Sequence, residues 1–259
     1  MARTGECALV TGASKGVGRG IAIGLAEAGW SIGINYFTDQ DGAEATASHI
    51  RDTGGTAGIL QADVGDSGQV REMFTVFMEQ AGHLDLLVNN SGVQTWALLL
   101  EFDEKDWNRA IRTNLKGTFL CTQQAAQIMK DARGGVIINI GSGANKAPFP
   151  SLADYCASKG GIETFTVVAE VELGPYGIRV NGVMPGCIEI ERTRGEYPNY
   201  ENTWGPLTPL RRIGHAEDVA KAVTFLASSE AEFIAGQTLH GDGGLWSQVP
   251  SPYGEDQIA

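Results

Sequence analysis

A tyrosine and a lysine stand four residues apart in the segment YCASK, at Tyr155 and Lys159, with only small residues between them. On a helix this spacing places both side chains on one face, a single turn apart. A free phenol has a pKa of about 10, so it is a poor base at neutral pH unless a nearby positive charge stabilises the phenolate. The pair is therefore either a solvated surface pair or an acid–base device, and the rest of the chain decides between them.

The elements that must position this pair alternate between short apolar runs and longer helical patterns. Continuously apolar strands separated by helices are typical of a parallel sheet that is covered on both faces. The predicted strands cover 7–11, 31–36, 57–63, 84–92, 134–142, 177–186 and 237–244. Helices are predicted to about Ala28, over 41–54, 67–82, 104–131 and 152–173, and from about Ala216.

This order predicts one α/β domain over residues 1–246. It is a doubly wound Rossmann fold, with a mostly seven-stranded parallel sheet flanked by helices on both faces. The only long irregular insertion, at about 187–212, is rich in Pro, Tyr, Glu and Arg, and we expect it to form a substrate lid. Residues 247–259 form a tail, which either reaches the active site of a neighbouring subunit or hangs free.

Composition excludes several classes of partner. The net charge of −12 argues against binding to nucleic acid or to an anionic membrane, because the summed field repels phosphate. No run of about 18 apolar residues is present, so no membrane span is expected, and the N-terminus lacks the apolar region of a signal peptide. The four cysteines are widely spaced without a CxxC pair. We therefore expect no metal site, no disulfide framework and a cytoplasmic location.

A glycine-rich segment, TGASKGVGRG, follows the first predicted strand and opens the first helix. Gly12, Gly16 and Gly18 allow the backbone to turn sharply and to approach a pyrophosphate, while the helix N-terminus supplies N–H donors. The spacing G-x-x-x-G-x-G differs from the G-x-G-x-x-G of the dinucleotide fingerprint. A plain tight turn would not require three glycines in seven positions, so the segment predicts a dinucleotide site.

The residues at the end of the second strand bear on the choice of cofactor. NAD-binding domains carry an Asp or Glu there for the ribose 2′-OH, whereas this strand ends with Asn35 and Tyr36. Lys15 inside the glycine loop is suited to pair with a 2′-phosphate. NADP(H) is therefore favoured. NAD(H) stays open, because Asp39 and Asp41 lie close to Lys15 and no arginine follows the strand.

Ligands of such sheets bind outside the carboxyl ends of the strands, where further motifs of this chain gather. Over about 1–246 the sequence closely resembles the short-chain dehydrogenase/reductase family, including its 3-oxoacyl-acyl-carrier-protein reductase-like and glucose 1-dehydrogenase-like members. The motifs that carry the resemblance are TGASKGVG (11–18), NNSG (89–92), Asn114, Ser142, YCASK (155–159), PG (185–186) and GDGG (241–244).

The resemblance implies a catalytic tetrad of Asn114, Ser142, Tyr155 and Lys159. Tyr155 would protonate the carbonyl oxygen during reduction or deprotonate the alcohol during oxidation. Ser142 would hold that oxygen by a hydrogen bond. Lys159 would bind the nicotinamide ribose and lower the pKa of Tyr155. Asn114 would anchor a water that relays protons to the lysine.

The resemblance also implies a set of residues that bind the cofactor. Asp63 and Val64 would flank the adenine, Asn89 would lie near the adenosine ribose, and the backbone amide of Ile188 would bind the carboxamide. The predicted set comprises Gly12, Ser14, Lys15, Gly16, Val17, Gly18, Asn35, Tyr36, Asp63, Val64, Asn90, Ser91, Gly92, Tyr155, Lys159, Pro185, Gly186 and Ile188.

The lid departs from the family pattern at one position. Ile190 stands where the family often has a threonine that contacts the cofactor, and Thr193 would replace that hydroxyl if the loop is shifted. The charged lid residues either hold substrate hydroxyls or face water, and facing water is the favoured interpretation. They are Glu189, Glu191, Arg192, Arg194 and Glu196.

Aromatic residues are predicted to wall the substrate pocket. Gln94, Trp96, Phe149 and Trp204 are the predicted substrate contacts, and Tyr197 and Tyr200 add to the aromatic surface. Such a wall suits a ketone, a cyclic substrate or a sugar.

These features predict an NADP(H)-dependent oxidoreductase that interconverts a small carbonyl compound and its secondary alcohol. An acidic carrier protein is not favoured as partner, because this chain is itself strongly acidic. An NAD-dependent polyol or sugar dehydrogenase is the alternative enzyme, and a non-catalytic dinucleotide-binding regulator is the alternative of another class. The apolar faces of helices 104–131 and 152–173, with the last strand and the resemblance, predict a homotetramer.

Overall fold

Seven parallel strands form one sheet in the computed structural model, which describes residues 5–132 and 134–247. The strand order is β3-β2-β1-β4-β5-β6-β9, so the order reverses between β1 and β4. The strands are β1 (Cys7–Val10), β2 (Ser31–Tyr36), β3 (Ala57–Gln61), β4 (Leu86–Asn89), β5 (Gly135–Ile140), β6 (Ile178–Pro185) and β9 (Thr238–Gly241). The predicted doubly wound Rossmann fold is confirmed, and its ligands are expected at the carboxyl ends of the strands near the reversal.

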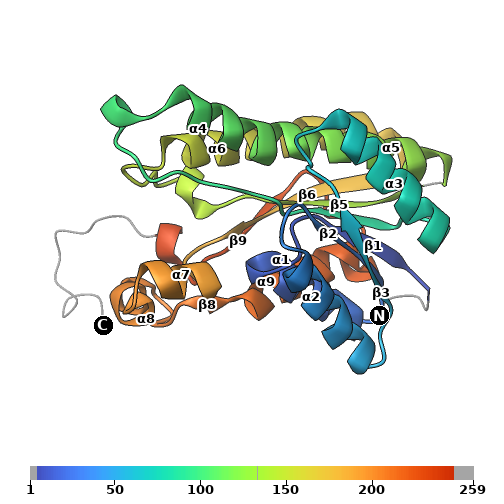
Figure 1. Cartoon of the computed structure of the whole chain (residues 1–259), viewed down its shortest axis with the longest axis horizontal. Helices are drawn as coiled ribbons and strands as arrows, with labels where there is room; N and C mark the ends of the chain where they lie inside the picture. Colours follow the sequence, from blue (N-terminus) through green and yellow to red (C-terminus); the bar gives the residue numbers. More distant parts are fainter. Residues whose placement is uncertain (1–4, 133, 248–259) are drawn as a thin grey trace.

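Two layers of helices cover this sheet (Figure 1). One face carries α1 (Gly16–Glu27), α2 (Gln40–Asp52) and α9 (Ala216–Ala227), and the other carries α3 (Ser67–Ala81), α4 (Glu104–Ala110), α5 (Gly117–Asp131) and α6 (Ala153–Leu173). Apolar residues at helical spacing bury one stripe of each long helix, as Ile21 and Leu25 of α1 and Phe74 of α3 illustrate. The two cores therefore lie on opposite faces of the sheet.

The single helix predicted over 104–131 is interrupted. The chain forms α4, then a π-helical turn at Ile111–Lys116, and then α5. A π-turn accommodates an extra residue and is frequent at functional sites. Here Asn114 lies inside the turn and is fully buried.

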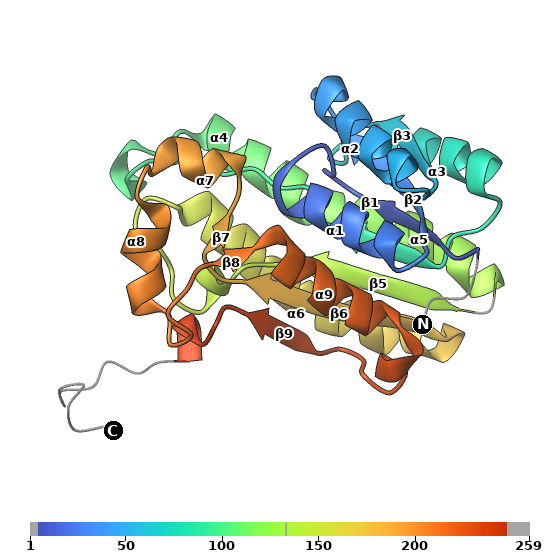
Figure 2. The same cartoon turned by 90° about the horizontal axis from the view of Figure 1, so that it is seen from below.

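The insertion at 187–212 is more ordered than predicted. Strand β7 (Ile188–Glu189) pairs in parallel with β8 (Gly214–His215), and the helices α7 (Glu191–Glu196) and α8 (Tyr200–Trp204) lie between them. A small cluster of Cys187, Ile213 and Leu245, with Tyr200, Trp204 and Trp246 against it, gives this lid its own core. Figure 2 shows α7 and α8 beyond the end of the sheet.

The remaining expectations concern membranes, cysteines and the tail. Within 5–132 and 134–247, the helices lack the length and apolar character that crossing a membrane requires. All four cysteines are free thiols. Cys7 does meet two further potential ligands, since donor atoms of Cys7, His83 and Asp85 lie within 4.8 Å of one another at the opposite end of the sheet from the site below. Residues 248–259 of the predicted tail lie outside the described residues.

Candidate active site

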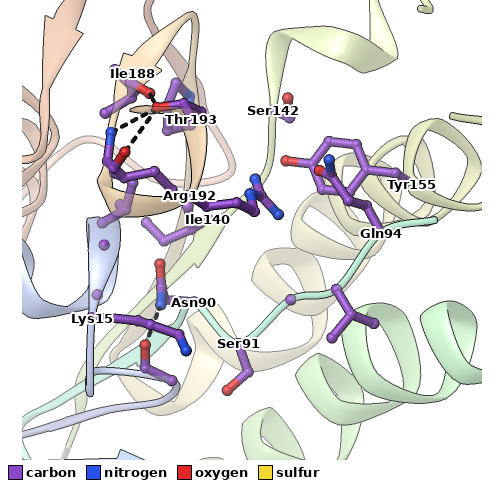
Figure 3. A pocket seen from close by; sticks show the side chains of 18 of the residues that line it. Lys15, Asn90, Ser91, Gln94, Ile140, Ser142, Tyr155, Ile188, Arg192 and Thr193 are labelled. Atoms are coloured by element: carbon purple, nitrogen blue, oxygen red, sulfur yellow. Dashed lines mark hydrogen bonds between the residues drawn. The ribbon is translucent and has the colours of Figure 1, made fainter. Parts of the chain in front are cut away.

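A cavity of about 910 Å³ lies at the carboxyl ends of the strands, between the glycine loop, α6 and the lid. Figure 3 shows part of its lining, with Lys15 and Asn90 at one end and Ser142 and Tyr155 at the other. Apart from Asn89, every residue predicted to bind cofactor or substrate lines this cavity, and so do three members of the predicted tetrad. Asn114, the fourth member, is buried behind the wall.

The glycine loop has the backbone shape that a phosphate cradle requires. Gly12 and Gly16 have φ values of +61° and +59°, and residues other than glycine rarely adopt such positive values. A Cβ atom at Gly12 would lie 2.9 Å from Ser91, and one at Gly18 would collide with the Asn90 amide and the Gly12 carbonyl. Side chains are thus excluded from the loop, and its fit to a dinucleotide phosphate is preserved.

Two asparagines hold this loop in place. The side-chain oxygen of Asn35 accepts from the Gly12 N–H at 3.1 Å, and its amide donates to the carbonyls of Leu60 and Ala62. The Asn90 amide donates to the carbonyls of Thr11 and Gly12, at 3.0 and 3.1 Å. Both residues line the cavity, and their side chains are occupied in bracing the loop.

An anion of the protein itself sits at the start of α1. The Gly16 N–H donates to one carboxylate oxygen of Glu191 at 3.1 Å, and Arg19 donates to the other at 3.2 Å. The N–H groups and dipole of a helix N-terminus favour negative charge. The lid carboxylate therefore occupies a position suited to a cofactor phosphate, which supports the fit of the loop to that group.

The end of the cavity beside β2 carries features for and against NADP(H), since Lys15 lines it but is paired with Asp39, the residue that leaves NAD(H) open. Lys15 forms an ion pair with Asp39 at 3.3 Å, and β2 ends without a carboxylate. The Asp63 carboxylate lines the cavity and is held by Arg112 and by the Gly65 N–H.

Asn89 is the exception among the residues expected near the adenosine. Its amide donates to Thr122 at 3.0 Å and to Asn139 at 2.9 Å, inside the layer between β4, β5 and α5. Asn89 is buried and is not among the residues that line the cavity. The expectation that it lies near the ribose is wrong, because it is the last residue of β4 and its side chain points into the core rather than out of the strand end.

The reacting end brings Ser142, Tyr155 and Lys159 together. Ser142 follows β5, while Tyr155 and Lys159 lie one turn apart on α6, with the ammonium 5.5 Å from the centre of the Tyr155 ring. The Lys159 ammonium donates to the Ile140 carbonyl at 2.7 Å and is 3% exposed. The shared helix face predicted from the four-residue spacing thus faces the cavity.

Burial dominates the electrostatics of this pair. It raises the pKa of Tyr155, although a hydrogen bond with Ser142 and the charge of Arg192 act to lower that pKa. Burial, with the repulsion of Arg192, lowers the pKa of Lys159 to about 8. The expected lowering of the Tyr155 pKa relied on a cationic nicotinamide as well as on Lys159. In the protein alone, loss of water outweighs the neighbouring charges and the pKa of Tyr155 is raised.

The side chain of Asn114 is occupied by protein partners. Its oxygen accepts from the Val93 N–H at 2.8 Å, and its amide donates to the Val93 carbonyl at 2.8 Å and to Ser158 at 2.9 Å. These bonds tie the segment after β4 to α6, which carries Tyr155. Both amide hydrogens are already donated, so the predicted water could only donate a hydrogen bond to an oxygen of Asn114.

Two lid residues resolve the departure from the family pattern. Ile190 packs over the glycine loop, where its Cδ1 would lie 3.4 Å from a Cβ atom at Gly16. The Thr193 hydroxyl bonds to the Ile190 backbone at 2.9 and 3.0 Å, and so closes the first turn of α7. Thr193 thus stabilises the lid, and an apolar side chain covers the loop in place of a hydroxyl.

The aromatic residues predicted to wall the substrate pocket line the cavity and pack against one another. Phe149 meets Trp204 and Trp246 edge to face at 5.5 Å between ring centres, and Trp96 meets Tyr197 at 6.2 Å. Trp246 was not among the predicted contacts, because its position depends on how the chain returns to the lid after β9. Three lid residues that were expected to face water also line the cavity, namely Glu191, Arg192 and Glu196.

Comparison with known proteins agrees with this arrangement. A family model described as enoyl-(acyl carrier protein) reductase matches residues 12–246. The chain is 40% identical over 241 residues to the 3-oxoacyl-[acyl-carrier-protein] reductase FabG of Staphylococcus epidermidis, covering 93% of this chain and 99% of that protein.

Two solved structures extend the comparison. A putative gluconate dehydrogenase from Agrobacterium tumefaciens has a TM-score of 0.90 and 34% identity, covering 95% of this chain and 98% of that chain. A gluconate 5-dehydrogenase from Burkholderia cenocepacia, in complex with NADP and tartrate, has a TM-score of 0.89 and 37% identity, covering 95% and 97%.

Proposed function

Because the chain belongs to the short-chain dehydrogenase/reductase family of oxidoreductases, we propose that it interconverts a small carbonyl compound and its secondary alcohol with NADP(H). The observation that carries this proposal is the position of Ser142, Tyr155 and Lys159 in the same cavity as the glycine loop. A dinucleotide held by the loop would extend from the Lys15 end toward the Tyr155 end. The cavity therefore joins a cofactor site to a proton donor.

Residues of this chain supply the proton that the carbonyl oxygen gains during reduction. When bound, the nicotinamide supplies or accepts the hydride. In the direction of reduction, Tyr155 gives its proton to the carbonyl oxygen, and the raised pKa keeps that proton on the phenol until it is needed. Ser142 donates a hydrogen bond to the same oxygen as negative charge develops on it. Lys159 supplies positive charge beside the phenol, and Asn114 positions α6.

We propose NADP(H) rather than NAD(H) as cofactor. Lys15 lines the cavity beside the end of β2, and its partner Asp39 holds it there at 3.3 Å. A lysine is suited to a 2′-phosphate, whereas the carboxylate that would bind a free ribose hydroxyl is absent from β2. Among similar proteins, the Burkholderia gluconate 5-dehydrogenase was solved with NADP.

A polyol or sugar dehydrogenase is the second candidate function. The aromatic rings around Phe149 favour it, since rings of this kind pack against the C–H faces of sugars, and two similar structures are described as gluconate dehydrogenases. The FabG relatives are named as reductases of 3-oxoacyl-[acyl-carrier-protein]. The charge of −12 on this chain favours a free small substrate instead.

The assembly and location remain part of the proposal. Exposed apolar side chains gather on α5 and α6, where Phe119, Val167, Val168 and Val171 are 43–73% exposed, and they support a homotetramer. The four free thiols support a cytoplasmic location.

Two measurements test the function. Fluorescence titration with NADPH and NADH should show a preference for NADPH of more than about tenfold, or about 1.4 kcal/mol. Lys15→Ala should remove that preference by weakening NADPH alone. A preference for NADH would instead favour the NAD-dependent alternative.

The catalytic role is tested on Tyr155. Tyr155→Phe should keep the affinity for NADPH while turnover of any carbonyl substrate falls by roughly 10²–10⁴-fold, because the phenol is the proton donor. Tyr176→Phe makes the same change at an exposed tyrosine that does not line the cavity, so it is the matched control and should retain most of the turnover. If Tyr155→Phe leaves activity unchanged, the proposed chemistry is wrong. A wild-type protein that binds NADPH but reduces no carbonyl would favour a non-catalytic dinucleotide-binding protein.

A further inference from the structure

The lid places a positive charge at the reacting end of the cavity. Arg192 belongs to α7 and lines the cavity, and Figure 3 shows its side chain running past Ile140 toward Tyr155. The charge of Arg192 acts on the pKa of both Tyr155 and Lys159, which confirms that the guanidinium lies near the reacting groups. The lid therefore contributes more than a cover to this end of the site.

The positive charge of the Arg192 guanidinium is poorly neutralised by neighbouring carboxylates. Among the cations lining the cavity within the described residues, Lys15 pairs with Asp39 at 3.3 Å, Arg109 with Asp106 at 3.3 Å, and Arg112 with Asp63. Among the carboxylates of residues 5–132 and 134–247, Arg192 pairs with that of Glu196, at a loose 4.0 Å. Lys159, buried close by, bonds to a carbonyl rather than to a carboxylate.

Two weakly compensated cations at one end of a cavity are unusual in a chain with a net charge of −12. Their mutual repulsion is a cost that an anion bound between them would remove. A guanidinium holds a carboxylate in two parallel hydrogen bonds, more strongly than a neutral donor would. The aromatic wall of Phe149, Trp204 and Trp246 lies at the same substrate end and suits the carbon chain of such a molecule.

We propose that the substrate is a hydroxy or keto carboxylic acid, whose carboxylate is bound by Arg192 of the lid. The inference rests on the proposed function and names its class of substrate. The reaction balances as keto acid, NADPH and one proton giving hydroxy acid and NADP⁺. The carbonyl carbon gains the hydride, the carbonyl oxygen gains a proton from Tyr155, and the carboxylate is unchanged.

The experiment compares acids with neutral molecules of the same skeleton. D-gluconate and D-glucitol differ only in a carboxylate against a hydroxymethyl group, and 5-keto-D-gluconate and L-sorbose form the matching pair for reduction. Lactate with 1,2-propanediol and glycerate with glycerol extend the series to shorter chains. We expect kcat/KM for the acid of at least one pair to exceed that of its neutral partner by roughly tenfold to hundredfold, since one charged hydrogen-bonded contact is at stake.

Variants of lid residues test whether Arg192 is the cause of the preference for acids. Arg192→Gln should remove the preference for the acid, lowering kcat/KM for the acid roughly tenfold more than for its neutral partner, whereas Arg192→Lys should retain part of the preference. Arg194→Gln is the matched control. This arginine lies two residues further on the same helix, pairs with Glu189 at 3.2 Å and is not among the residues lining the cavity.

Each result bears on the proposal differently. A preference for the neutral partners, or an equal loss on acid and neutral substrate in Arg192→Gln, overturns it. If Arg192→Gln weakens NADPH binding while the preference for acids survives, the anion held by Arg192 is the cofactor diphosphate and the proposal is wrong.

A binding measurement separates this proposal from the proposed function. Calorimetric titration of the NADP⁺-loaded protein with tartrate should show binding that Arg192→Gln abolishes and Arg194→Gln leaves intact. Such binding without turnover of any substrate would contradict the proposed function and support the anion site. The absence of binding that depends on Arg192 would overturn the anion site even if neutral carbonyl compounds are reduced.

Discussion

Burial shifts the pKa values of Tyr155 and Lys159 in opposite directions, because it favours the neutral form of each group. The phenol loses water and its pKa rises, while the ammonium loses water and its pKa falls to about 8. The proton therefore stays on Tyr155 throughout the neutral range, and Lys159 is the member of the pair that titrates near working pH. The pair acts as a proton donor beside a charge that pH can remove.

This order of titration predicts the pH dependence of carbonyl reduction. Below about pH 8 both Tyr155 and Lys159 hold their protons, so kcat/KM should be constant. Above about pH 8 Lys159 becomes neutral and its charge no longer stabilises the site, so kcat/KM should fall. A pH–rate profile of kcat/KM at saturating NADPH measures this limb.

Arg192 gives the profile an internal check. Its charge lowers the pKa of Lys159, so Arg192→Gln should move the descending limb to higher pH. A limb that stays in place or moves to lower pH would contradict the assignment to Lys159.

At the scale of elements, the lid is fastened to the glycine loop through one carboxylate. Glu191 at the start of α7 accepts from Gly16 and from Arg19 of α1, although about 175 residues separate the two segments. The same N–H groups are those expected to meet the cofactor phosphates. Glu191 must therefore leave the loop when the dinucleotide enters, and the lid must move with it or turn this side chain away.

We expect Glu191→Gln to bind NADPH roughly threefold to tenfold more tightly than the wild type, because a neutral amide competes less well for a helix N-terminus than a carboxylate does. Fluorescence titration measures the affinity. Glu189→Gln is the matched control, since Glu189 pairs with Arg194 inside the lid and does not contact the loop. Unchanged or weaker binding in Glu191→Gln would show that the carboxylate does not compete with the phosphates.

At the scale of the whole molecule, the outer faces of α5 and α6 remain apolar although the sheet is already covered. Val171 is 73% exposed and Val168 is 49% exposed, and Phe119 meets Phe165 edge to face across the two helices. Contiguous apolar surface of this kind marks protein–protein contacts. It supports the proposed assembly through these helices.

A charge placed on this surface should break the assembly. We expect the wild type to sediment as a tetramer and Val171→Glu to sediment as a smaller species, because a carboxylate would be buried without a partner in the interface. Thr75→Glu adds the same charge to the exposed side of α3 and should remain tetrameric. A wild type that sediments as a monomer, or a Val171→Glu variant that stays tetrameric, would exclude this face as the interface.

The sequence alone was sufficient for the fold, the glycine loop and the grouping of Ser142, Tyr155 and Lys159. These depend on local signals: apolar runs of strand length, helical spacing, and glycines where φ is positive or backbones approach closely. The topology then brings strand ends to one edge of the sheet, so motifs at those ends converge without any knowledge of side-chain contacts. The segment 187–212 shows no such strand or helix periodicity, so the strand and helices of the lid were not predicted from the sequence.

Only the tertiary structure decided what each side chain meets. Asn89 and Asn90 are neighbours in one motif, yet one enters the core and the other braces the loop. Arg192 and Arg194 look alike in the sequence, yet only Arg192 lines the cavity. The direction of the Tyr155 pKa follows from how much water the surrounding elements remove, a property of contacts between distant segments. Spacing determines which residues share a face, whereas burial and partners determine what those residues do.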